Sequence, residues 1–284
     1  MRLATGSYVG SGVDDRQIAG IGFQPDVVII KAATNQAGVM RTSTMSGDRA
    51  KVLGSTGALL SNCIQSIGAD GFTVGTDGRV NAWGTAYYWV AMKAGSDLAV
   101  GSYVGNGADN RSIAGVGFQP VWVVTLGDGS DSAFRPGPLP GDNSYLMTGS
   151  AASANLIQAL QADGFQVGSD AAVNQSGTTF HYIAWATSPQ VNAGNYTGNH
   201  NDNRSITGAG FAPQMTWVKR TGTRPSVWRP ASLSGDASLF WGATTLGSDR
   251  IQALESDGFQ VGTDQDVNTN GQVYYYLNLR DGGS

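Results

Sequence analysis

One sequence module is written three times along the chain, and this repetition constrains the fold more than any other feature. The phrase "DGF-x-VG" recurs about 94 residues apart, with long matches on either side. The longest matched phrase reads "GSYVGSGVDDRQIAGIGFQP" (6–25), "GSYVGNGADNRSIAGVGFQP" (101–120) and "GNYTGNHNDNRSITGAGFAP" (194–213). Solenoid repeats are shorter and cannot bury a core alone, whereas a unit of this length can. The repeat therefore predicts three similar globular modules, at residues 1–97, 98–191 and 192–284.

The joints between the modules are short. They read "KAGSDLAV" (93–100) and "TSPQVNA" (187–193), which leaves little chain for independent movement. We therefore expect the modules to lean on one another. Three equivalent units also suggest a pseudo-threefold axis, around which one chain takes the place of a homotrimer.

The apolar stretches indicate strands rather than helices. They are short, rich in β-branched and aromatic residues, and bounded by Gly, Asn, Asp and Pro. Two strands in each module are apolar on both faces, which places them between two layers or between one module and the next. These strands are expected at 26–31, 121–125 and 215–219, and at 87–92, 180–186 and 274–279. With six to eight short strands in each module, the fold class is all-β, as three antiparallel β-sandwich or jelly-roll modules.

An Asp-Gly pair predicts a hairpin within each module. The pairs lie at 70–71, 163–164 and 257–258. Asp-Gly favours the type I′ turn, whose positive φ values match the twist of paired strands. In the second module we expect "IQALQA" to enter this turn and "FQVG" to leave it, although the incoming segment fits a helical turn nearly as well.

Composition excludes several classes of partner. Only 13% of the residues are charged and the net charge is −4, so there is no basic stripe for nucleic acid or anionic lipid. No apolar run approaches the length of a membrane span, and no export signal is visible at the start. Cys63 is the single cysteine, which excludes a disulfide framework. We expect no nucleic-acid partner and no membrane partner.

The repeated polar residues indicate turn chemistry more than catalysis. Neither His181 nor His200 belongs to the shared pattern, and no catalytic motif is present. Paired carboxylates would suit a polysaccharide depolymerase, but Asp is also a turn former, and turns account for every repeated position. The repeated acids are Asp70, Asp163 and Asp257; Asp48, Asp142 and Asp236; and Asp77, Asp170 and Asp264. We expect no enzyme activity and no cofactor.

A loop site for calcium is the alternative reading of one set of these acids. Asp77, Asp170 and Asp264 are each followed four residues later by Asn, at Asn81, Asn174 and Asn268, and these oxygens could face a cation. The spacing matches neither an EF-hand nor a calcium-binding nonapeptide. Stabilisation of a turn is the preferred interpretation, so no metal is expected.

Repeated arginines and scattered tryptophans are the candidates for binding. In a chain this poor in charge, a repeated Arg has a partner carboxylate or an interface to hold. Arg41, Arg135 and Arg229 are the candidate interface or ligand-binding arginines, with an ion pair inside the module, to Asp48, Asp142 and Asp236, as the structural alternative. Arg16, Arg111 and Arg204 form a second repeated set.

Tryptophan fills cores by default, but it also binds sugars and proteins. Trp83, Trp228 and Trp241 are the candidates for an interface or ligand site among the seven tryptophans. Trp83 and Trp241 are expected to be exposed, because Gly and polar residues flank them.

The combined pattern resembles repeats of tailed-phage and prophage virion and surface proteins. In that family a "G-F-x-P-D-x-V-x-I-K" strand precedes "DGF-x-VG…VN…G-x-x-Y", and the resemblance covers residues 6–279. The chain departs from the pattern where Val121 and Gln214 replace the Asp found at Asp26, and where Leu126 replaces the Lys found at Lys31 and Lys219. The resemblance implies a role on the outer virion or in surface adhesion, and supplies no catalytic residues. A weaker similarity runs to small six-stranded sugar-binding lectin sandwiches.

These observations lead to an expected function. The chain is expected to be a non-enzymatic phage structural protein at the virion surface, either a head decoration protein or a short fibre component, with capsid or tail proteins as partners. The alternative is a multivalent lectin-like protein that binds a receptor or host surface glycan, with avidity from three copies. A lectin would keep one loop cluster alike in every module, but the loops at 32–39, 126–133 and 220–227 differ strongly. This drift favours the structural reading.

Overall fold

The computed structural model describes residues 1–283, and each module in it folds as eight β-strands. Module 1 contains β1 (Arg2–Val9), β2 (Arg16–Ala19), β3 (Val27–Ala32), β4 (Val39–Thr42), β5 (Lys51–Val52), β6 (Ile64–Gly68), β7 (Gly71–Val74), α1 (Gly78–Asn81) and β8 (Ala86–Lys93). Module 2 contains β9 (Leu98–Val104), β10 (Arg111–Ala114), β11 (Trp122–Gly127), β12 (Ser132–Pro136), β13 (Tyr145–Leu146), β14 (Ile157–Gln161), β15 (Gly164–Val167), α2 (Ala171–Asn174) and β16 (Thr179–Trp185). Module 3 contains β17 (Val191–Thr197), β18 (Arg204–Thr207), β19 (Met215–Arg220), β20 (Val227–Pro230), β21 (Leu239–Phe240), β22 (Ile251–Glu255), β23 (Gly258–Val261) and β24 (Val273–Leu279). The all-β prediction is confirmed, and none of the helices in residues 1–283 has the length and apolar character to cross a membrane.

Each module is a sandwich of two antiparallel sheets. In module 1 the five-stranded sheet has the order β1-β8-β3-β4-β5 and the three-stranded sheet the order β2-β7-β6, and modules 2 and 3 repeat both orders. The first strand of every module pairs with the last one, as β1 does with β8 along its whole length. Each module is therefore built from its own continuous stretch of chain, with no exchange of strands.

The central strand of each large sheet is buried on both faces, as its apolar sequence predicts. In β3, Val28 and Ile30 pack into the sandwich of module 1, whereas Val27 and Ile29 point to the opposite side. Successive side chains of a strand alternate between the two faces of the sheet, so a run of apolar residues can serve two cores at once.

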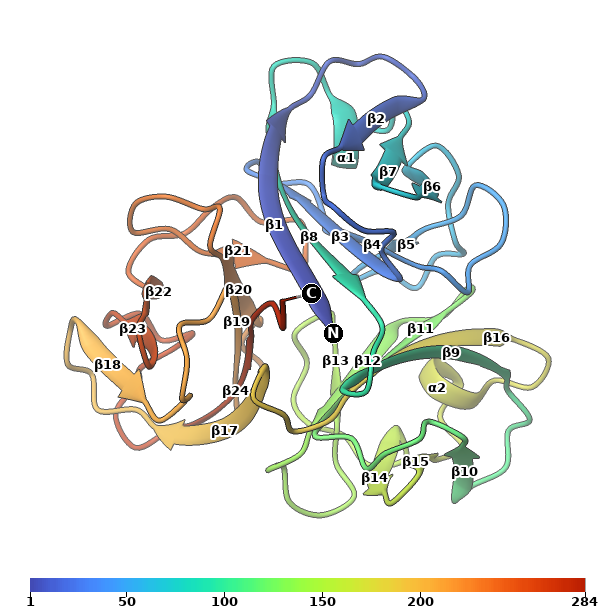
Figure 1. The fold of residues 1–284 in the computed structure, drawn as a ribbon. Coiled ribbons are helices and arrows are strands. Elements are labelled where there is room, and N and C mark those ends of the chain that lie inside the picture. The colour runs from blue at the N-terminus through green and yellow to red at the C-terminus, as the bar shows by residue number, and fades with distance from the viewer. Residues whose placement is uncertain (284) are drawn as a thin grey trace.

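The second face of the three large sheets forms a core that all three modules share. Its members include aromatic residues from modules 2 and 3, namely Trp122, Phe134, Trp217, Trp228 and Trp241, together with aliphatic residues from all three modules. In Figure 1 the modules surround this centre, where both ends of the chain also lie. The predicted pseudo-threefold arrangement is confirmed.

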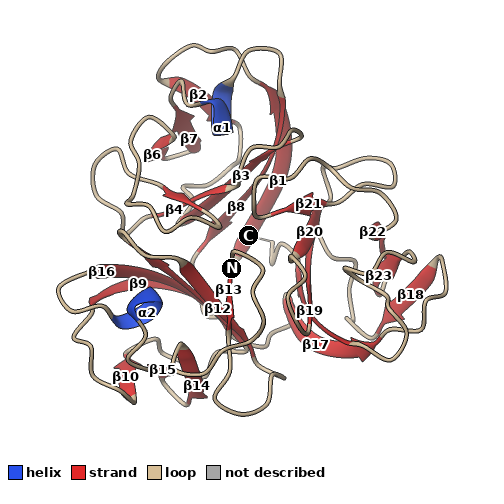
Figure 2. Cartoon of the chain, turned by 180° about the vertical axis from the view of Figure 1, so that it is seen from behind, coloured by secondary structure: helices blue, strands red, loops and turns tan. Residues whose placement is uncertain are grey.

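Each module contacts the next one around the ring. Figure 2 shows this ring of modules from behind. The Lys51 ammonium of module 1 donates to the Ser130 carbonyl of module 2. Module 2 contacts module 3 through the Tyr145 ring, whose centre lies 4.5 Å from Lys219 Nζ. Module 3 closes the ring on module 1, because Gly38 N donates to the Trp241 carbonyl at 2.8 Å.

The predicted hairpins form, but the type I′ turn with Asp-Gly at its centre is wrong. In module 2, β14 is confirmed as a strand and pairs with β15, and the turn between them consists of Ala162 and Asp163. Gly164 is the first residue of β15 and has φ of 137°. Glycine is required there because an added Cβ would lie 2.0 Å from the Ile113 carbonyl oxygen of the neighbouring strand β10.

Two alanine variants measure how much the close approach of β10 to Gly164 would cost in free energy of unfolding. Gly115 also has a positive φ, of 85°, but an added Cβ there would meet no atom within 4 Å. We expect Gly115→Ala to lower the free energy of unfolding by about 1–2 kcal/mol through backbone strain alone. Gly164→Ala should cost about 1–3 kcal/mol more, because the methyl group also overpacks against β10. Equal losses in urea unfolding would show that the close approach of β10 is not what selects glycine.

Candidate functional site

The three repeated arginines lie inside their modules and bind main-chain carbonyl groups. Arg41, Arg135 and Arg229 are each 6% exposed. The Arg229 guanidinium donates to the carbonyl oxygens of Leu233, Gly235, Ala237 and Ile251. Arg41 and Arg135 make the same four contacts in modules 1 and 2. The candidate interface or ligand-binding arginines thus bond inside their own modules, as in the structural alternative, but their partners are carbonyl groups and not the carboxylates of that alternative.

Electrostatics at these arginines follow from burial and from one nearby acid. Burial lowers the pKa of Arg229, and the negative charge of Asp236 raises it. Asp236 itself accepts a hydrogen bond from Asp249 N at 3.0 Å, so it fastens a different loop. The guanidinium therefore organises the loop after β20 instead of facing a ligand.

The aspartate before each hairpin glycine fastens a distant loop. In module 2, Asp163 accepts hydrogen bonds from Gly115 N at 3.1 Å and from Gly117 N at 2.6 Å. Asp70 and Asp257 make the equivalent bonds in modules 1 and 3. Sequence reasoning assigned these acids to their own turns and missed this bridge, although the "G-x-G-F" phrase repeats together with "DGF".

The oxygens weighed as calcium ligands are already occupied. Asn174 is fully buried; its Oδ1 accepts from Asn106 N and Arg111, and its Nδ2 donates to the carbonyls of Ala108 and Gly168. Asp170 caps α2 by accepting from Ala172 N at 2.8 Å. Among residues 1–283 no group of three or more His, Cys, Asp or Glu side chains is placed to hold a metal ion. These contacts favour the interpretation as turn stabilisation.

Two of the three candidate tryptophans are buried. Trp228 and Trp241 stack with ring centres 4.7 Å apart in the shared core, and are 0% and 1% exposed. The expectation that Trp241 is exposed is wrong, because the segment after β21 crosses the seam onto module 1 and carries Trp241 inward. Both residues join modules and cannot reach an external ligand.

Trp83 is exposed, as expected, and it has apolar neighbours. Its exposed fraction is 84%, and those of Val13 and Val9 are 62% and 58%. The segments that carry them run side by side, since Gly12 N donates to the Asn81 carbonyl and Gly84 N to the Gly10 carbonyl. We call Val9, Val13 and Trp83 the apolar tip. It lies at the outer end of β1, away from the centre of the ring (Figure 1).

The apolar tip belongs to module 1 alone. The equivalent residues are Val104, Ala108 and Ser176 in module 2, and Thr197, Asn201 and Asn270 in module 3. Of these, only Val104 is a large exposed apolar side chain. The three modules thus share their internal frame and differ at their outer ends.

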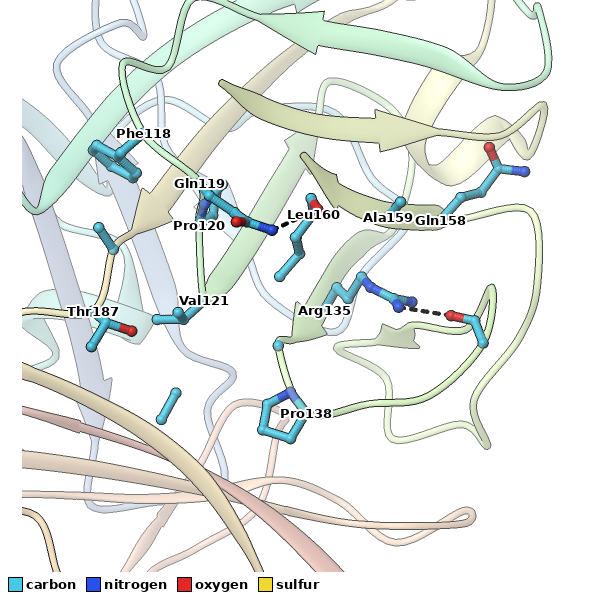
Figure 3. A pocket seen from close by; sticks show the side chains of 14 residues that line it. Phe118, Gln119, Pro120, Val121, Arg135, Pro138, Gln158, Ala159, Leu160 and Thr187 are labelled. Carbon is cyan, nitrogen blue, oxygen red and sulfur yellow. Dashed lines mark hydrogen bonds between the residues drawn. The ribbon is translucent and has the colours of Figure 1, made fainter. Parts of the chain in front are cut away.

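A cavity of about 780 Å³ lies beside Arg135, at the seam between modules 2 and 3. Phe118, Pro120, Pro138 and Leu160 form its apolar wall (Figure 3). The Arg135 guanidinium reaches away toward the loop carbonyls, including Gly141 O at 2.7 Å. A smaller groove of about 350 Å³ occurs beside Arg229 in module 3, so this hollow is a by-product of the shared frame.

The chain thus consists of three tandem β-sandwich modules, which form a ring around one shared core. Residues 186–284, which hold module 3 and the whole of the preceding joint, match a family model described as a domain of unknown function, DUF7483. No curated protein matches the chain. The similarity to the family covers this one module.

Proposed function

We propose that the protein is a non-enzymatic structural protein exposed on the surface of a tailed-phage virion, as a head decoration protein or a short fibre component. The observation that carries the proposal is that the repeated polar residues hold loops in place inside each module. The Arg, Asp and Asn side chains that all three modules share are bonded to loops of their own module. These repeated hydrogen bonds stabilise the fold of each module. They do not form three copies of a reactive site.

The apolar tip supports attachment at one end of this body. A Trp that is 84% exposed beside two exposed valines is a feature typical of an interaction surface. Tryptophan is enriched among the residues that dominate binding energy at interfaces. Because only module 1 carries the tryptophan and both valines together, we infer that the ring binds its virion partner through module 1 and leaves modules 2 and 3 facing solvent.

The test uses phage particles that lack the protein. Purified protein is mixed with these particles, and bound material is separated and weighed by size-exclusion chromatography with light scattering. We expect the wild-type chain to saturate the particles at a fixed stoichiometry. A double variant, Trp83→Ser with Val13→Ala, copies the residues of module 2 and should weaken binding about 30-fold or more, since an interface Trp contributes about 2 kcal/mol or more.

The control and the contrary outcomes separate the two parts of the proposal. Ser176→Ala changes the equivalent position of module 2 and should leave binding unchanged. If the double variant binds like the wild type, the apolar tip is not the attachment surface. If the wild-type chain does not bind to the particles and binds to host cells or glycans instead, the lectin-like alternative replaces the structural role.

A further inference from the structure

Another cavity, of about 300 Å³, lies at the seam between modules 1 and 2 and is lined almost entirely by polar side chains. Module 1 contributes Ser46 and Arg49, and module 2 contributes Ser102, Asp128 and His181. Its volume is at the lower end of the range for small-molecule sites, about 300–1,000 Å³. The cavity is independent of the apolar tip and of the repeated arginine frame.

His181 is a buried residue in the lining of this cavity. It is 5% exposed, and its Nδ1 lies 2.8 Å from Thr44 Oγ1, so a hydrogen bond across the seam fixes the ring. Nε2 makes no hydrogen bond to any other of residues 1–283. Burial lowers the pKa of His181, so the ring is neutral at pH 7 and presents Nε2 without a charge.

Two side chains of opposite charge, Asp128 and Arg49, also line the cavity, and the main chain of Leu59 bonds to both. Leu59 N donates to Asp128 Oδ1 at 2.8 Å, and Arg49 Nη1 donates to the Leu59 carbonyl at 3.0 Å. Neither Asp128 Oδ2 nor Arg49 Nη2 bonds to another of the described residues. The cavity therefore offers a fixed carboxylate acceptor and a fixed guanidinium donor with no net charge between them.

This set of side chains is found at one seam only. The residues equivalent to His181 are Tyr88 and Tyr275, and those equivalent to Arg49 are Asn143 and Ala237. The ring closes at the other two seams without His or Arg at these positions. The polar cavity is therefore not required to hold the modules together.

We propose that the cavity at the seam of modules 1 and 2 binds one residue of a neutral saccharide. A sugar hydroxyl both donates and accepts hydrogen bonds, so it can pair with the Asp128 carboxylate, the Arg49 guanidinium and the hydroxyls of Ser102 and Thr179. The Asp128 carboxylate would repel an anion and the Arg49 guanidinium would repel a cation. The balanced charges therefore favour a neutral ligand. This inference goes beyond the proposed structural function and does not depend on it.

The test is ligand-observed NMR on the full chain with glucose, galactose, mannose and N-acetylglucosamine as probes. We expect at least one of them to bind with a Kd of about 10 mM or tighter. His181→Tyr introduces the residue present at the other two seams, and Asp128→Asn keeps an acceptor for Leu59 N, so both variants should fold. Each should weaken binding at least tenfold, whereas Asp14→Asn, at an exposed acid of module 1, should not.

Three results would overturn the inference. The first is that none of the four sugars binds at concentrations up to about 50 mM. The second is that a sugar binds equally well to both seam variants and to the wild type, which would place it elsewhere. The third is that inorganic phosphate competes for the cavity more strongly than any neutral sugar, which would assign the site to anions.

Discussion

Trp217→Ala is expected to lower the free energy of unfolding by about 3–5 kcal/mol. The Trp217 ring, from β19, lies in the shared core with ring centres 5.0 Å from Trp122, 4.6 Å from Phe134 and 4.9 Å from Trp241. Its indole N–H has no hydrogen-bond partner among residues 1–283, so the loss reports packing alone. Because Trp122 and Phe134 belong to module 2, the cavity left behind also loosens the seam between modules 2 and 3.

Urea unfolding measures this loss, with Trp83→Ala as the matched control. Trp83 has the same chemistry but is 84% exposed, so its removal should change stability by no more than about 0.5 kcal/mol. Limited proteolysis at the joint 187–193 reports the loosened seam, and we expect faster cleavage in Trp217→Ala only. Equal effects of the two variants would mean that the shared core contributes little to holding the ring together.

Arg229→Met is expected to cost about 3–5 kcal/mol, an effect of similar size with a different cause. Methionine keeps much of the apolar stem, but the carbonyl oxygens of Leu233, Gly235, Ala237 and Ile251 lose their donor. Buried acceptors without a partner cost about 1–3 kcal/mol each, less where the loop can relax toward water. Arg229→Lys should recover little of this loss, because an ammonium cannot reproduce the planar fork of the guanidinium.

Arg224→Met is the control in the same module. Arg224 lies 3.5 Å from Asp266, and its side chain is 41% exposed, so we expect a loss of at most about 1 kcal/mol. Thermal melting of the two variants and of Arg229→Lys distinguishes the explanations. If Arg229→Lys is as stable as the wild type, charge alone, and not the four-carbonyl geometry, holds the loop after β20.

Local patterns predicted the strands and the modules because those features depend on neighbours in the sequence. The apolar run of β3 and its repeats indicated burial on both faces, and the structure places one face in each of two cores. The same reasoning named Arg41 and its equivalents as candidate interface or ligand-binding residues, with an ion pair inside the module as the alternative. It chose the wrong partner because a carbonyl oxygen carries no sequence signature, whereas Asp48 does.

Contacts between residues that are far apart in the sequence could not be predicted from local patterns. The bridge from Asp163 to Gly115 and Gly117 spans 48 and 46 residues, and Asp also suits its own turn, so the local reading was preferred. The expectation that Trp241 is exposed gave weight to Gly242 after it and not to Leu239 and Phe240 before it; Trp241 is buried because a segment of module 3 crosses onto module 1. The seam cavity likewise arises only when Arg49 and His181 meet across two modules.

The first and last residues of the described chain lie close together at the centre of the ring (Figure 1). The amino group of Met1 pairs with the buried Asp97, Arg2 Nε lies 3.1 Å from Asp281 Oδ1, and Gly282 N donates to the Met1 carbonyl. Every module is also closed by its own first and last strands. At the seam between modules 3 and 1, which neither joint crosses, non-covalent contacts therefore close the ring.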